Sequence, residues 1–181
     1  MRYQRHLEVA HRAWEKYKHP DIAIDATCGN GHDTLFLAQL EPKELYAIDL
    51  NPQAIAATKQ RVPFTQAHFL CQSHTQFPEH ILQSSVDLIV YNLGYLPGGN
   101  KAETTLANTT LKSLSQALLL LKPGGLISVT CYPGHAEGED EEKEILACAR
   151  TLNPKDWTIQ FHQWINRAKS PTLLLIEKNL L

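Results

Sequence analysis

Short apolar runs alternate with amphipathic segments along most of this chain. The apolar runs end at glycine, proline or polar clusters, which is typical of strands buried in a sheet. The predicted strands are 22–27, 45–50, 67–73, 86–93, one within 121–134, 157–165 and 172–178. The segments between them predict helices at 1–19, 32–40, 52–61, 107–121 and 139–151. Two helices have distinct apolar faces, made of Tyr3, Leu7, Ala10, Trp14 and Tyr17 in the first and of Ala107, Leu111, Leu114, Leu118 and Leu121 in the fourth.

Strands that alternate with helices need crossover connections, which build a mostly parallel sheet with helices on both faces. No helix separates the last two predicted strands, so we expect an antiparallel hairpin at the sheet edge. The prediction is an α/β fold, a Rossmann-like doubly wound sheet of seven strands with an antiparallel C-terminal hairpin. At 181 residues, the chain is expected to be a single domain with an N-terminal helix at 1–19 and a core at 20–181.

The composition narrows the class of protein. A net charge of −2 argues against coating nucleic acid by bulk electrostatics, but not against a specific RNA bound through a local basic patch. Four cysteines without a C-x-x-C pair predict reduced thiols and a cytoplasmic location, and the histidines lack metal-ligand spacing, so no metal is expected. The charged N-terminus is no signal peptide, and no apolar run approaches the roughly 20 residues of a membrane span. We therefore expect no membrane partner.

The turn after the first predicted strand has the features of a cofactor loop. Gly29 and Gly31 let the backbone approach a ligand, and the following helix offers N–H groups and a positive dipole end. Asp49 ends the second predicted strand, from which an acid can reach ribose hydroxyls. These features predict a nucleoside-containing cofactor, either a dinucleotide or S-adenosyl-L-methionine. Thr34 replaces the third glycine of a dinucleotide fingerprint and Asp25 would repel a pyrophosphate, which favours S-adenosyl-L-methionine.

Several motifs extend this interpretation to a family. "DATCGNG", "AIDLN" and "LLKPGGLISV" are similar, in sequence and order, to motifs of class I S-adenosylmethionine-dependent methyltransferases. "NLGYLPGGNK", "YPGH" and "IEK" resemble, more narrowly, a small bacterial family labelled rRNA methylases. The resemblance spans residues 22–178 and implies a tRNA methyltransferase that converts 5-aminomethyl-uridine to 5-methylaminomethyl-uridine at the wobble position.

The same resemblance implies a set of cofactor-binding residues. The region after the third predicted strand lacks the acid that many class I enzymes place near adenine, so Ser73 or His74 is expected to take that role. The full set is Asp25, Thr27, Gly29, Asn30, Gly31, Asp33, Asp49, Asn51, Ser73, His74 and Asn92.

The ends of the fourth and fifth predicted strands carry the expected catalytic residues. Asn92 and Tyr95 have the spacing seen in amino-methyltransferases, where carbonyl oxygens orient the acceptor nitrogen and the aromatic ring packs on the base. Leu93 and Gly94 stand where those enzymes have two prolines. The loop therefore lacks the stiffness of proline, and an aliphatic amine fits as acceptor as well as a planar base does. Tyr132 and His135 are expected to face the same site, although a surface histidine in a Pro-Gly turn explains His135 equally well.

Two charged segments have simpler interpretations. The acidic run 139–142 is interpreted as the solvated first turn of a helix, where the helix dipole stabilises acidic side chains. Basic residues could contact tRNA phosphates, although an ordinary solvated face explains any one of them as well. They are Arg2, Arg5, Arg12, Lys16, Lys18, Arg167 and Lys169.

The favoured function is therefore an S-adenosylmethionine-dependent RNA methyltransferase that N-methylates 5-aminomethyl-(2-thio)uridine at the tRNA wobble position. One alternative keeps the cofactor but takes rRNA or a small-molecule amine as acceptor. A distant alternative is an oxidoreductase or a non-catalytic nucleotide-binding domain. The sequence leaves the oligomeric state open, a homodimer included.

Overall fold

The computed structural model describes residues 5–94, 107–167 and 169–180. Its helices are α1 (Arg5–Trp14), α2 (His32–Gln39), α3 (Pro52–Arg61), α4 (Ala107–Leu120) and α5 (Ala136–Arg150). Its strands are β1 (Ile22–Asp25), β2 (Glu44–Asp49), β3 (Ala67–Cys71), β4 (Val86–Asn92), β5 (Leu121–Cys131), β6 (Trp157–His162) and β7 (Thr172–Lys178).

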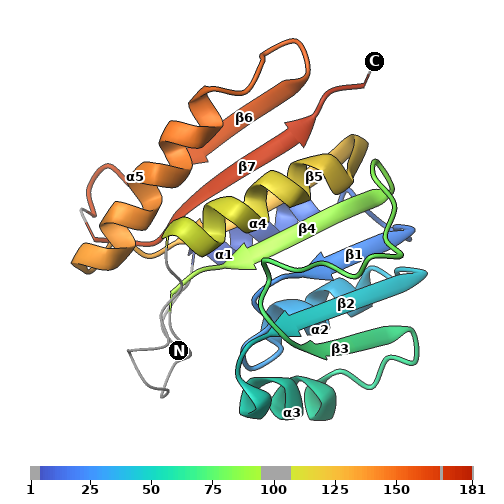
Figure 1. Ribbon diagram of the computed structural model, residues 1–181. Helices are drawn as coiled ribbons and strands as arrows, with labels where there is room; N and C mark the ends of the chain where they lie inside the picture. The colour runs from blue at the N-terminus through green and yellow to red at the C-terminus, as the bar shows by residue number, and fades with distance from the viewer. Residues whose placement is uncertain (1–4, 95–106, 168, 181) are drawn as a thin grey trace.

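The predicted sheet is confirmed. Seven strands follow the order β3-β2-β1-β4-β5-β7-β6, and the first five in this order pair in parallel (Figure 1). β7 pairs antiparallel with both β5 and β6, which places the expected hairpin at the edge of the sheet. The strand order reverses between β1 and β4, so their carboxyl ends are where a ligand is expected to bind.

Helices cover both faces of the sheet, as Figure 1 shows. Successive residues of a strand point to opposite faces. In β1, Ala23 therefore packs in a core with α1 and α2, which includes Trp14 and Leu37. Ile24 packs in the opposite core with α4 and α5, which includes Leu114. The short first helix is thus anchored on the sheet by its own buried residues.

The connection from α4 to β5 differs from the prediction. Leu121 begins β5 rather than ending the apolar face of α4, and Leu111 and Leu118 are only partly buried. The buried face of α4 instead includes polar residues and is made of Thr110, Ser113, Leu114, Ala117 and Leu120. The Pro-Gly-Gly segment lies inside β5, where the pairing with β4 shifts register between Val86 and Leu88. The Pro-Gly-Gly sequence, which is typical of a turn, is therefore part of an irregular strand in this protein.

The acidic run at the start of α5 is not simply a solvated turn. α5 begins at Ala136, earlier than predicted, so Glu141 and Glu142 lie beyond its first turn. Glu141 is buried and accepts a 2.6 Å hydrogen bond from the Thr110 hydroxyl, and Glu142 accepts one from Thr172. These two acids attach α5 to α4 and β7, and the prediction of a solvated side chain is wrong for Glu141, whereas Glu142 is partly exposed.

Replacing Gly125 by Ala is expected to destabilise the fold. An added Cβ would lie 2.9 Å from the Lys122 carbonyl oxygen and 3.0 Å from that of Asp87, so the β4–β5 pairing must shift. We expect a loss of about 1–3 kcal/mol in the free energy of unfolding, measured by urea denaturation. The control is Gly134→Ala, whose Cβ would lie 3.7 Å from the Lys169 carbonyl oxygen, an ordinary van der Waals distance. Equal stability of the two variants would contradict this account of the strand.

Candidate active site

The loop after β1 is organised by a buried carboxylate. Asp25 is 1% exposed and accepts hydrogen bonds from the Thr34 hydroxyl at 2.6 Å and from the Thr27 backbone N–H at 3.2 Å. Burial, with a further contribution from the charge of Asp33, raises the pKa of Asp25 to about 7. Asp25 therefore fastens the loop to the first turn of α2.

Asp49, at the end of β2, connects two loops. One carboxylate oxygen accepts a 2.9 Å hydrogen bond from the Gly29 N–H, and the other accepts a 2.8 Å bond from the Asn51 N–H. The Asn51 side chain in turn caps α3 by accepting from the Gln53 N–H at 2.8 Å. Asp49 thus fixes the glycine loop relative to the loop after β2, the pair of loops that a bound nucleoside would contact.

The glycine loop also packs tightly on α3. Gly31 has φ of 76°, and an added Cβ would lie 2.9 Å from the Thr58 Cα. The Thr58 hydroxyl donates to the Gly29 carbonyl at 2.9 Å, and Arg61 Nε donates to the Asn30 carbonyl at 2.7 Å. Glycine is needed at position 31 for both its backbone conformation and this close approach.

Beyond the end of β3, Ser73 and His74 have different environments. The Ser73 hydroxyl lies 2.9 Å from that of Thr75 and accepts from the Thr75 N–H at 3.2 Å, so it shapes the local turn. His74 is 7% exposed, and within the described residues its Nδ1 has no hydrogen-bond partner. Burial lowers the pKa of His74, so it is a neutral imidazole with one unused polar atom at neutral pH.

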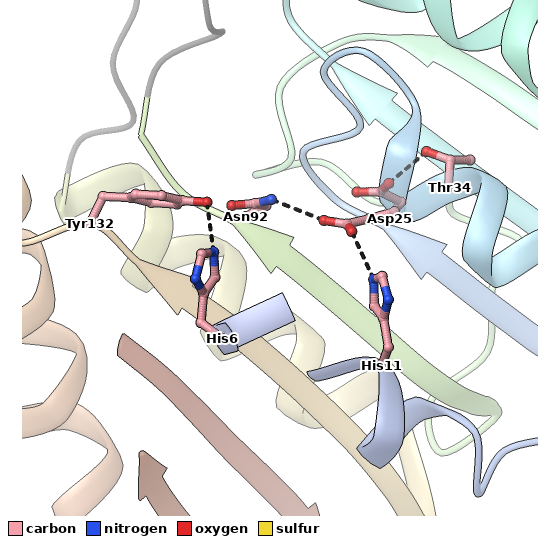
Figure 2. Close-up of polar contacts among 7 residues, drawn as sticks. His6, His11, Asp25, Thr34, Asn92 and Tyr132 are labelled. Carbon is pink, nitrogen blue, oxygen red and sulfur yellow. Dashed lines mark hydrogen bonds and ion pairs between the residues drawn. The ribbon is translucent and has the colours of Figure 1, made fainter. Parts of the chain in front are cut away.

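Asn92 and Tyr132 come together at the ends of β4 and β5, as Figure 2 shows. The Asn92 N–H donates to the Thr27 hydroxyl at 2.7 Å, and its Nδ2 donates to an Asp33 carboxylate oxygen at 2.9 Å. The Tyr132 ring lies beside Gly94, where an added Cβ would meet it at 3.6 Å. Burial raises the pKa of Tyr132 to about 12, so its hydroxyl stays protonated at neutral pH.

Two histidines of α1 belong to the same cluster and were not predicted (Figure 2). His6 is 6% exposed, meets the Tyr132 ring edge to face at 5.9 Å, and has Nε2 3.5 Å from its hydroxyl. Burial lowers the pKa of His6. His11 has Nε2 3.3 Å from the other carboxylate oxygen of Asp33. Neither residue falls on the apolar face from which the helix was predicted, and their spacing matches no motif.

Of the other two predicted catalytic residues, His135 is not part of this cluster. His135 is the N-cap of α5, where its Nδ1 accepts from the Gly138 N–H at 3.1 Å and lies 3.2 Å from a Glu137 carboxylate oxygen. This favours the structural interpretation of His135. Tyr95 lies outside the described residues.

These residues fit the predicted cofactor. Asp49 and the glycine loop lie at the carboxyl ends of β1 and β2, where a nucleoside is held in this fold. The Nδ1 of His74 is a buried polar atom with no hydrogen-bond partner among the described residues, and an adenine edge could provide one. Three carboxylates near the loop suit the cationic methionine end of the cofactor better than a pyrophosphate. The fold and this arrangement define a class I S-adenosylmethionine-dependent methyltransferase.

Within that class, the chain belongs to one particular family. The family model described as "Putative rRNA methylase" matches residues 45–178. A curated relative from Arabidopsis thaliana, the chloroplastic tRNA (mnm(5)s(2)U34)-methyltransferase, is 36% identical over 189 residues, which cover 94% of this chain and 68% of the relative.

Two solved structures are similar over almost their whole length. A protein from Clostridium thermocellum described as a "putative rRNA-methylase" has a TM-score of 0.90 at 32% identity, and the match covers 96% of this chain and 97% of that protein. A protein from Streptococcus mutans described as "a putative methyltransferase" and solved in complex with SAH has a TM-score of 0.86 at 28% identity, and the match covers 97% of this chain and 99% of that protein. The enzyme class and the cofactor, S-adenosyl-L-methionine, rest on these relatives together with the site.

Over residues 5–94, 107–167 and 169–180, no helix is long and apolar enough to cross a membrane. Within the same ranges, no group of three or more His, Cys, Asp or Glu side chains could hold a metal ion.

Asp25→Asn is expected to change the pH dependence of stability. The pKa of Asp25 in the folded protein, about 7, lies above its ordinary value of 3.8, so ionisation destabilises the fold as the pH rises from about 4 through about 7. The asparagine does not titrate. The free energy of unfolding of the variant should therefore gain about 2–4 kcal/mol relative to the native protein across this range.

Urea denaturation of both proteins between about pH 4 and about pH 8 measures this difference. Carboxyl groups that do not interact with Asp25 titrate alike in both proteins, so their contributions cancel. A difference that stays constant with pH would show that Asp25 has no raised pKa.

Proposed function

We propose that this enzyme N-methylates the aminomethyl group of 5-aminomethyl-(2-thio)uridine at the wobble position of tRNA, giving 5-methylaminomethyl-(2-thio)uridine. The observation that carries the proposal is the Asn92 amide at the end of β4. Its Nδ2 donates to Asp33, so Oδ1 is the side-chain atom that can accept a hydrogen from an amine. A carbonyl oxygen has two lone pairs and can serve a substrate as well as a neighbouring group.

The identity of the acceptor is supported by the Arabidopsis relative, whose name places its activity on the modified uridine at tRNA position 34. The description of the matching family names rRNA as the molecule methylated, which supports an RNA acceptor. A substrate amine held by Asn92 agrees with both.

An aliphatic amine must lose a proton before it can be methylated. With a pKa near that of lysine, about one molecule in a thousand is neutral at pH 7, which costs about 4–5 kcal/mol. His6 is a buried, neutral base beside Tyr132, and it is better placed than the capping residue His135 to take this proton. Two charged or titratable groups also act on the pKa of His6: Asp33 on α2 raises it and His11 on α1 lowers it. The Tyr132 hydroxyl is the neighbour of its Nε2.

S-adenosyl-L-methionine, when bound, supplies an activated methyl group: the nitrogen–carbon bond forms as the carbon–sulfur bond breaks and its electron pair stays on sulfur. The proton removed beforehand passes through His6 to solvent, and the product of the transfer is a secondary ammonium. The protein contributes the orientation of the nitrogen by Asn92 and packing by Tyr132. We assign no catalytic role to a metal.

The cofactor-binding residues are proposed in three groups. Asp49 holds the ribose hydroxyls, and His74 contacts adenine while Ser73 shapes the turn beside it. The backbone of the glycine loop holds the methionine end. Asp25, Thr27 and Asn51 keep these loops in place through the hydrogen bonds described above.

Exposed basic residues could position the RNA. Arg12, Lys16 and Lys18 lie on or just after α1, and Arg167 and Lys169 precede β7. Gly134 follows Tyr132 by two residues, and a Cβ added at Gly134 would lie 3.7 Å from the Lys169 carbonyl oxygen. The segment with Arg167 and Lys169 therefore adjoins the site. We propose that these side chains contact tRNA phosphates. We also propose a single domain in the cytoplasm, which agrees with four free cysteines.

Incubation of the purified enzyme with S-adenosyl-L-methionine and tRNA that carries 5-aminomethyl-uridine should methylate this nucleoside. Mass spectrometry of tRNA digests should then show a gain equal to one methylene group, and Asn92→Ala should abolish most of it. Parallel reactions with rRNA and with pools of small amines are the controls. Transfer to either pool, with the tRNA unchanged, would refute the proposed acceptor and leave the enzyme class intact.

Asp49→Ala should weaken binding of S-adenosylhomocysteine by about 10- to 100-fold, because hydrogen bonds to a charged group contribute about 1.5–3 kcal/mol. Calorimetry measures this directly and needs no RNA. The matched control is Glu144→Ala, an exposed acid on α5. Undiminished affinity of the Asp49 variant would remove this residue from the cofactor site.

A further inference from the structure

Asp33 joins the first helix to the end of the central strand β4. It is 8% exposed, and its two carboxylate oxygens face different partners. One accepts a hydrogen bond from Asn92 Nδ2 at 2.9 Å, and the other lies 3.3 Å from His11 Nε2. The carboxylate therefore has a partner on each side, one from α1 and one from β4.

His11 is itself held in one orientation. Its ring stacks on Phe36 of α2, with centroids 4.0 Å apart and planes at 19°, and it lies 4.9 Å from the Trp14 ring. Phe36 follows Asp33 by three residues, so the two side chains are neighbours on α2. One side of α2 thus fixes the plane of the imidazole through Phe36 and binds its edge through Asp33.

This arrangement decides which way the Asn92 amide points. An ionised carboxylate only accepts hydrogen bonds, so the amide must present its NH₂ group to Asp33. The amide oxygen then lies on the opposite side, and Figure 2 shows it directed toward Tyr132. In the reversed amide, oxygen would face oxygen, and the NH₂ group would be presented to the substrate. Such an amide would repel the N–H groups of an amine.

We propose that Asp33 and His11 are positioning residues that set the orientation of Asn92, with Asp33 acting in this way rather than as a contact to the cofactor. His11 acts through Asp33, and Asp33 acts through Asn92. The inference rests on the proposed function for the identity of the amine that Asn92 receives. It replaces the expectation that Asp33 binds S-adenosyl-L-methionine.

The orientation of Asn92 can be observed without any reaction. In protein labelled with ¹⁵N at asparagine, the Asn92 side-chain NH₂ signals are assigned by their loss in Asn92→Ala. We expect these signals to shift in Asp33→Ala and to keep their positions in the control Asp140→Asn, whose side chain is 77% exposed on α5. Unshifted signals in Asp33→Ala would overturn the proposal.

Kinetics and calorimetry separate positioning from cofactor binding. Asp33→Ala should lower kcat about 10- to 100-fold, since a misplaced reactive group costs rate. Its dissociation constant for S-adenosylhomocysteine should stay within about threefold of the native value. Asp33→Asn, which retains an oxygen to accept from Asn92, should recover most of kcat. A parallel loss of kcat and cofactor affinity in both variants would instead make Asp33 a cofactor contact.

The dependence of His11 on Asp33 can be tested by a double-mutant cycle. His11→Ala alone should lower kcat several-fold, about 3- to 10-fold, and His11→Gln should restore part of it by donating to Asp33. In the Asp33→Ala background, His11→Ala should have no further effect on kcat. Additive losses would refute the proposed order of action. His19→Asn is the control, because His19 is 71% exposed away from this cluster.

Failure of this inference and failure of the proposed function give different results. If tRNA with 5-aminomethyl-uridine is not methylated by the native protein, the function is wrong, while the NH₂ signals and the cofactor affinities still test the role of Asp33. If the native protein is active and the signals do not move, the function stands and the positioning role is wrong.

Discussion

The hydrogen bond from the Asn92 N–H to the Thr27 hydroxyl joins the ends of the two central strands, and the rest of the site depends on it. β1 and β4 pair up to Asp25 and Val90, and the Ala26 N–H extends this pairing by donating to the Val90 carbonyl. The backbone at Asn92 is therefore held on both sides, by Thr27 and by the pairing of Asn92 with Thr130 of β5. Only with that backbone held can the Asn92 side chain reach Asp33 at the start of α2.

The glycine loop is surrounded by three carboxylates, Asp25, Asp33 and Asp49. Like charges disfavour one another, which is part of the reason that the pKa of Asp25 is raised. Each carboxylate has its own donors: the Thr34 hydroxyl at Asp25, Asn92 at Asp33 and two backbone N–H groups at Asp49. The negative charge that is left suits a cofactor with a sulfonium and an ammonium group, and it disfavours a pyrophosphate.

The sequence predicted most of the fold because strands and crossover helices are set by local patterns. The alternation of apolar runs with amphipathic segments, the glycine loop and Asp49 can each be recognised from a short stretch of sequence. His6, His11 and Glu141 were missed or misread because their burial depends on packing between distant elements. A histidine next to an apolar helix face, or a glutamate in an acidic run, has no local signal for the Asp33 or Thr110 that it meets.

His135 shows the opposite case. Its position after β5 was compatible with the site, but the first turn of α5 requires a group to accept the Gly138 N–H, and His135 provides it. The assignment of Tyr132 as a partner of Asn92 depends on the paired ends of β4 and β5, which topology could predict.

The first helix connects the stability of the core with the geometry of the site. α1 has 10 residues in the described part of the chain, too few for a helix that is stable by itself, so its position depends on tertiary packing. Trp14 and Ala10 supply that packing in the same core as Leu37 of α2. The burial that docks α1 therefore also sets the distances from His6 to Tyr132 and from His11 to Asp33. Arg12 lies exposed beside His11 on α1. An RNA phosphate bound by Arg12 would therefore contact a helix whose other side is already held in place by His6 and His11.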